Sequence, residues 1–79
     1  MRIIVGNLPA DITEAAIREA LNDVAPVNAI KLVPEGGAPS AMIEMEMSRA
    51  DAEALARRIH GRIYQGRDLR AWVPLFDWK

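Results

Sequence analysis

Apolar and polar residues follow two different periods along this chain, and each period predicts one kind of element. Residues 2–5 are rich in β-branched side chains and predict a strand. Residues 27–33 and 41–47 predict two more strands, and residues 69–73 predict a fourth, which Pro74 ends. In the third strand the two sides alternate strictly, with Ala41, Ile43 and Met45 on one side and Met42, Glu44 and Glu46 on the other. That alternation is typical of a half-buried strand.

Two segments between these strands have helical spacing. Thr13 is a suitable N-cap for a helix over residues 14–22, and Pro26 prevents that helix from extending. Ser48 caps a second helix, and Gly61 is placed to end it in the left-handed conformation. The apolar stripes are Ile17, Leu21 and Val24 in the first helix, and Ala52, Leu55, Ala56 and Ile59 in the second.

The order β-α-β-β-α-β predicts an α+β, ferredoxin-like sandwich. It contains a four-stranded antiparallel sheet of order 4-1-3-2, with two helices on one face. The other face of the sheet has no helix to cover it, so an uncovered face is where such a domain would bind a ligand. Residues 1–73 are predicted to form a single domain, and residues 74–79 a C-terminal aromatic tail.

Composition narrows the class of protein. The 79 residues contain no cysteine, which excludes disulfides and thiolate chemistry, and no apolar run reaches the ~18–20 residues of a membrane span. Met1 leads straight into a strand, so we expect no cleaved signal and a cytoplasmic location. Residues 1–56 carry a net charge of −5 and residues 57–79 one of +4. The positive half is interpreted either as an ordinary solvated helix end or as a local basic edge.

The sequence does not predict an enzyme. His60 is the only histidine and has no evident nucleophile partner, and we expect it to act at the end of the second helix as a capping or dipole partner. Neither a metal-ligating cluster nor a phosphate-binding loop is recognisable, since Gly36 and Gly37 lie between two strands. We therefore expect no cofactor and no bound metal.

Several runs of residues resemble the RNA-recognition motif (RRM) family. Residues 3–9 (IIVGNLP), followed by Thr13-Glu14 opening a helix, are similar to the start of that motif, and residues 40–45 (SAMIEM) stand where the family has its third-strand signature. Residues 66–70 (GRDLR) are similar to its last turn and strand. The chain is thus identified as a short, single-domain, bacterial-like member, and the resemblance implies the fold above and single-stranded RNA as a partner.

The resemblance also implies where bases would stack. In this family, exposed aromatic residues on the two central strands stack bases. The corresponding positions here are Ile4, Ser40 and Met42, and the usual basic residue before the third strand corresponds to Ala38. Because base stacking on an aromatic ring is worth about 1–3 kcal/mol, losing two stacks would cost about 2–6 kcal/mol. We therefore expect weak or atypical RNA binding.

The four aromatic residues lie near the C-terminus: Tyr64, Trp72, Phe76 and Trp78. Alternation from Leu69 places Arg70 and Trp72 on the open face of the sheet. Three hypotheses compete for the tail. It covers the sheet as a lid, it replaces the missing stacking residues, or it docks onto a protein or a second copy of the chain.

The predicted nucleic-acid-binding residues are Arg2, Ile4, Asn7, Lys31, Ser40, Met42, Arg70, Trp72, Phe76 and Trp78. The alternative hypothesis is a degenerate RRM that uses the same face for a protein partner or a homodimer. The lost aromatic residues and the net charge of −1 motivate that alternative.

Overall fold

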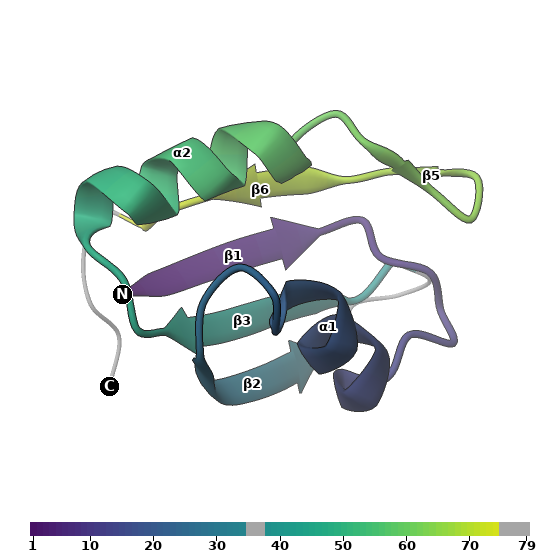
Figure 1. Cartoon of the computed structure of the whole chain (residues 1–79). Helices are drawn as coiled ribbons and strands as arrows, with labels where there is room; N and C mark the ends of the chain where they lie inside the picture. Colours follow the sequence, from purple (N-terminus) through teal and green to yellow (C-terminus); the bar gives the residue numbers. More distant parts are fainter. Residues whose placement is uncertain (35–37, 75–79) are drawn as a thin grey trace.

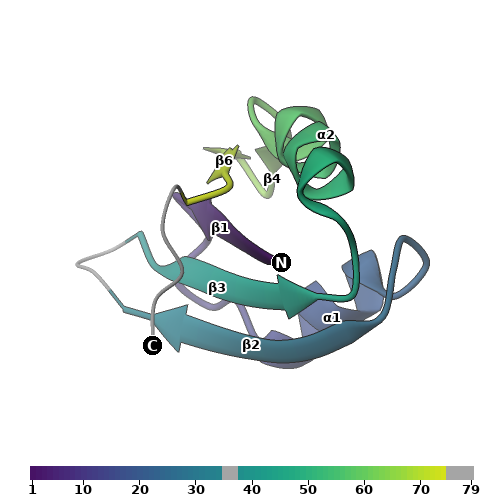
Figure 2. The ribbon, with the colours of Figure 1, turned by 90° about the vertical axis from the view of Figure 1, so that its left-hand side faces the viewer.

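The computed structural model describes residues 1–34 and 38–74, and its elements follow the predicted order (Figure 1). They are β1 (Arg2–Gly6), α1 (Glu14–Leu21), β2 (Val27–Val33), β3 (Ser40–Met45), α2 (Arg49–Ile59), β4 (Ile63–Tyr64), β5 (Arg67–Asp68) and β6 (Arg70–Trp72). Four strands pair antiparallel in the order β2-β3-β1-β6. This confirms the predicted sheet, with β6 as its fourth strand. Figure 2 shows both helices on the same side of the curved sheet.

Both helices begin at the predicted caps. The Thr13 hydroxyl accepts a hydrogen bond from the Ala16 backbone N–H at 3.2 Å, and the Ser48 hydroxyl accepts one from the Asp51 N–H at 3.2 Å. Each bond satisfies a backbone donor that the first helical turn leaves free. Gly61 follows the second helix with a φ of +87°, the left-handed conformation that the sequence predicts there.

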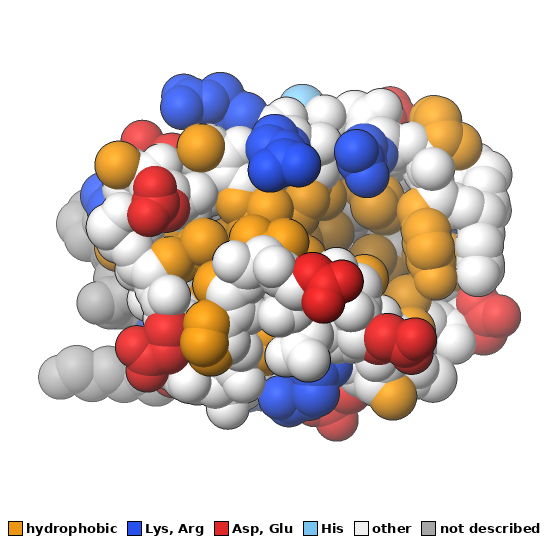
Figure 3. All heavy atoms as spheres, viewed as in Figure 1, with side chains coloured by type: hydrophobic (Ala, Val, Ile, Leu, Met, Phe, Trp, Pro, Cys, Tyr) orange, Lys and Arg blue, Asp and Glu red, His pale blue; other side chains and the backbone are white. Residues whose placement is uncertain are grey.

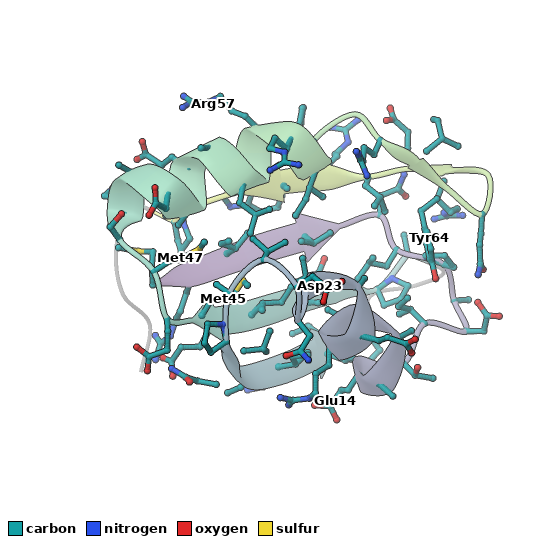
Figure 4. The ribbon with its side chains drawn as sticks, in the orientation of Figure 1. Glu14, Asp23, Met45, Met47, Arg57 and Tyr64 are labelled. Carbon is teal, nitrogen blue, oxygen red and sulfur yellow. The ribbon has the colours of Figure 1, made fainter. Side chains whose placement is uncertain are left out.

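The hydrophobic core lies between the helices and one face of the sheet. Buried and half-buried residues alternate along β3, and Met45, labelled in Figure 4, is fully buried. The main sheet and helix contributors are Ile3, Val5, Ala41, Ile43, Met45, Ile30 and Ala71 from the strands, and Ile17, Leu21, Ala52, Leu55 and Ala56 from the helices. The alternation therefore defines a covered and an uncovered face.

One element is missing from the sequence prediction. β4 and β5 pair with each other as a short hairpin between α2 and β6, where the sequence predicts only a turn. Gln65 and Gly66 join the two strands, and both have positive φ, at 50° and 78°. A two-residue loop with two positive φ values is the turn that suits the twist of a hairpin. Strands of two residues are too short to show an alternating pattern.

His60 connects the end of α2 to the edge strand β6. Its backbone N–H bonds to the Ala56 carbonyl at 2.8 Å, as a helix cap does. Its Nδ1 accepts a hydrogen bond from the Ala71 N–H at 3.2 Å, and this bond satisfies a donor on the outer side of β6. The side chain thus acts on a strand edge, where the sequence predicts a role confined to the helix end.

We expect His60→Ala to lower the free energy of unfolding by about 0.5–1.5 kcal/mol, because the Ala71 N–H loses its acceptor. Urea unfolding followed by circular dichroism measures this change. Arg57→Ala, on the exposed side of the same helix, is the matched control and should leave stability within about 0.5 kcal/mol. Equal stability of both variants would contradict the role of this hydrogen bond.

Candidate functional site

The candidate site is the sheet face that the helices leave uncovered, called here the open sheet face. It is formed by the outward residues Arg2, Ile4 and Gly6 of β1, Lys31 and Val33 of β2, Ser40, Met42 and Glu44 of β3, and Arg70 and Trp72 of β6. The structure therefore brings together eight of the ten predicted binding residues on or beside one surface, counting Asn7 at the end of β1. Phe76 and Trp78 lie outside the described residues, as do the three hypotheses on the tail.

Strand register places four of these side chains in a row across the sheet. Lys31 pairs with Met42 between β2 and β3. Met42 also faces Ile4 on β1, and Ile4 in turn faces Trp72 on β6. Neighbouring strands are about 4.8 Å apart, so the row spans about 14 Å from its basic end to its aromatic end.

Trp72 rests against Gly6. A Cβ on Gly6 would lie 3.7 and 3.8 Å from Cζ3 and Cη2 of the indole, and 3.6 Å from the Ser40 hydroxyl oxygen. The six-membered ring thus lies over Gly6, at ordinary contact distance from the position that a Cβ would take. Trp72 is still 47% exposed, so nearly half of its surface is open to a ligand. An indole supported by the sheet and open to solvent is a suitable surface for stacking.

The centre of the face is less accessible than the sequence suggests. Ile4 lies on the predicted face but is only 5% exposed, and it offers little surface to a ligand. Met42 and Ser40 beside it are half-buried. The accessible apolar surface is therefore concentrated at Trp72 and Met42, and Ile4 contributes as their packing partner.

The charged residues of the face divide into paired and unpaired groups. Nε of Arg2 lies 3.4 Å from Oε1 of Glu44, and Nη1 of Arg2 is buried without a hydrogen-bond partner among the described residues. Lys31 and Arg70 are exposed, and neither side chain forms an ion pair within residues 1–34 and 38–74. These two cations lie at opposite edges of the sheet, on β2 and β6.

Asn7 has a structural role at the edge of this face. Its φ of 61° is left-handed, a conformation that asparagine tolerates better than most residues. Its Nδ2 donates to the Asp68 carbonyl at 2.8 Å, and its Oδ1 accepts from Nη2 of Arg67 at 2.9 Å. Both ends of the amide are therefore engaged with β5, just before β6 begins.

The described part of the chain contains neither a membrane-spanning helix nor a group of metal-ligating side chains. There, no helix has the length and apolar character needed to span a membrane. Nor do three or more histidine, aspartate or glutamate side chains of residues 1–34 and 38–74 group closely enough to ligate a metal ion.

Comparison with known proteins gives a family match over most of the chain. A family model described as RNA recognition motif matches residues 3–70. No curated protein sequence matches the chain. The matched segment includes residues 3–6 of β1, all of β2 and β3, and the first residue of β6, and so spans most of the open sheet face.

Solved structures support the same fold. The third RRM of Pes4 is 20% identical with a TM-score of 0.83, over 99% of this chain and 95% of that one. The RRM of Rna15 with bound RNA (GU) is 25% identical, with a TM-score of 0.76 and coverage of 95% and 83%. The first RRM of SR1 from Plasmodium falciparum, in complex with ACAUCA RNA, is 30% identical, with a TM-score of 0.71 and coverage of 92% and 82%.

Proposed function

Because the chain belongs to the RNA recognition motif family, we propose that it binds single-stranded RNA on the open sheet face, with Trp72 as the main stacking residue. The observation that carries this proposal is the half-exposed indole supported by Gly6. Two structurally similar proteins, the RRMs of Rna15 and SR1, have RNA bound in their structures. Their likeness supports RNA as the class of ligand.

The proposed mode differs from the usual one in where the base stacks. The family's stacking positions on the central strands correspond to Ile4, Ser40 and Met42, none of which is aromatic. Trp72 lies one strand away on β6, directly opposite Ile4. A base stacked on the indole would extend toward Met42, whose polarizable thioether makes favourable contacts with rings. With one strong stack in place of several, we infer weak binding.

Lys31 and Arg70 are the proposed phosphate contacts. They lie at opposite edges of the sheet and flank the apolar row, so a strand of RNA crossing the sheet would pass both. Each contact to a phosphate releases counterions, and this makes the affinity depend on salt. The net charge of −1 provides no general attraction for RNA, and these two local cations therefore matter more.

The direct test is a titration of ¹⁵N-labelled full-length protein with short mixed-sequence RNA oligonucleotides at low salt. We expect shifts of backbone amides on β1, β3 and β6 and of the Trp72 indole N–H. An absence of shifts on these three strands at millimolar RNA would overturn the proposal. Shifts confined to the helices would also count against it.

Arg70→Ala should reduce the salt dependence of RNA binding. Removing one phosphate contact lowers the slope of log K against log salt by about 0.7 for single strands. Fluorescence anisotropy at four or five salt concentrations measures this slope. Arg58→Ala is the matched control, because Arg58 lies on α2 and lines the space between the two helices, away from the open sheet face. If the slope for Arg70→Ala is unchanged, Arg70 does not contact an RNA phosphate.

The same face supports a second candidate, a homodimer or protein interface. Tryptophan and arginine are favoured anchors of protein interfaces, and Trp72 and Arg70 are both exposed here. Sedimentation velocity over a micromolar to millimolar concentration series tests the dimer. A strict monomer over that range would rule the dimer out, and self-association that Trp72→Ala abolishes would favour it over RNA binding.

A further inference from the structure

A groove runs between α1 and α2 on the side of the molecule opposite the open sheet face. It is a partly open hollow with a volume of about 280 Å³. Figure 3 shows its hydrophobic floor between positive side chains above and negative ones below. The floor and walls include Val5, Leu8, Ile17, Ile43, Leu55 and Ile59. Core residues of both helices and of the sheet therefore border a space that no element of the described chain fills.

Exposed apolar side chains gather at this groove. Among the described residues the large exposed hydrophobic side chains are Val24, Ile63, Tyr64 and Trp72. The first three line the groove, and Ile63 alone is 69% exposed. Scattered exposed apolar residues are ordinary, whereas a group of them around a concave apolar surface is typical of an interaction site.

Arginine supplies the charge in the groove. Arg58 and Arg62 are the charged residues among the described ones that line it. Neither forms an ion pair within residues 1–34 and 38–74. An unpaired guanidinium is suited to bind a carboxylate with two parallel hydrogen bonds. The opposite wall belongs to α1, and Asp23 lies near its end on the side toward α2 (Figure 4). Among the residues that line the groove, those on the α1 side are uncharged, so its positive charge lies on the α2 side.

We propose that this groove binds a short peptide segment of a protein partner. A bulky aromatic or aliphatic side chain of the segment enters the hollow, and neighbouring acidic side chains face Arg58 and Arg62. The volume is close to the ~300 Å³ at the lower limit of ligand pockets, which suits one or two large side chains. Because both arginines lie on the α2 side of the groove, their charge also sets the orientation of the segment.

This site is independent of the proposed RNA site. The helices lie on one side of the sheet and Trp72 on the other, so the two ligands do not compete for surface. The groove would let a single small domain connect RNA to another protein. A failure of peptide binding would leave the RNA proposal unchanged, and the reverse also holds.

The test uses full-length ¹⁵N-labelled protein and two synthetic probes. One is the acetylated, amidated peptide Glu-Asp-Trp-Leu-Asp, and the other has lysine at each acidic position. We expect the acidic probe to shift the amides of Ala16, Ala20, Leu55 and Ile59, and the lysine probe to bind at least about tenfold more weakly. Arg58→Glu should lower the affinity for the acidic probe about tenfold. Arg57→Glu is the matched control on the outer side of α2.

Ile63→Ser provides a second variant that leaves the core intact, because Ile63 is largely exposed. This variant should also bind the acidic probe more weakly, and its circular dichroism spectrum should be unchanged. The proposal is overturned if the acidic probe produces no shifts at the groove at millimolar concentration, or if both probes bind equally. It is equally overturned if Arg57→Glu and Arg58→Glu have the same effect.

Discussion

Trp72→Ala should lower the affinity for single-stranded RNA by about 5- to 150-fold, because it removes a stack worth about 1–3 kcal/mol. The indole is supported by Gly6 on β1 and is 47% exposed, so a base gains one preformed face without any rearrangement of the sheet. No other aromatic side chain of the described residues lies on this face. The loss should therefore exceed that of any other single substitution there.

Fluorescence anisotropy of a labelled oligonucleotide at low salt measures the change. Tyr64→Ala is the matched control, since Tyr64 is also an exposed aromatic residue but lines the groove between the helices. Trp72→Phe should retain most of the affinity, because a smaller ring can still stack. If Trp72→Ala and Tyr64→Ala reduce the affinity equally, the stacking role of Trp72 is wrong.

Gly6→Leu tests the same contact from the other strand. A bare Cβ at this position would lie at ordinary contact distance from the indole, so the additional atoms of leucine must displace the ring. We expect a loss of RNA affinity although Trp72 is still present. Retention of full affinity would show that the support from Gly6 is not required.

The fold could be predicted from the sequence because its signals are local and agree with one another. Thr13 and Ser48 make the expected helix caps, and residues 40–45 keep the alternation that defines the covered face. The hairpin of β4 and β5 could not be predicted in this way. Its strands are two residues long, and only the positive φ values at Gln65 and Gly66 establish the turn.

The sequence predicts which sheet face carries the candidate site, but it does not predict the side-chain contacts within that face. Alternation predicts Arg70 and Trp72 on the open sheet face, and they pair there with Gly6 and Ile4, but the contact of the indole with Gly6 depends on the register between β1 and β6. That register involves residues far apart in the sequence, so no local pattern encodes it. Nor does any local pattern predict that Ile4, on the open sheet face, is only 5% exposed.

Asn7→Ala should lower the free energy of unfolding by about 2–4 kcal/mol. The substitution removes two hydrogen bonds, one to the Asp68 carbonyl and one from Arg67. Loss of the second leaves the half-buried guanidinium of Arg67 without that partner. It also places alanine at a φ of 61°, a left-handed conformation that asparagine tolerates better than alanine does. Urea unfolding measures the total, and Asn7→Gly, which avoids the backbone strain, should lose about 1 kcal/mol less.

The same variant separates two roles for Asn7. The sequence suggests a contact to RNA, whereas the hydrogen bonds indicate that Asn7 positions β5 and, through it, the Arg70–Trp72 strand. If Asn7 is a positioning residue, the Asn7→Ala protein should be less stable, and its β6 amides should shift even in the absence of RNA. If Asn7 contacts the RNA instead, the variant should bind RNA more weakly, with its free energy of unfolding unchanged. We expect the first outcome, because both polar ends of the amide are engaged within the protein and a phosphate or base would have to displace them.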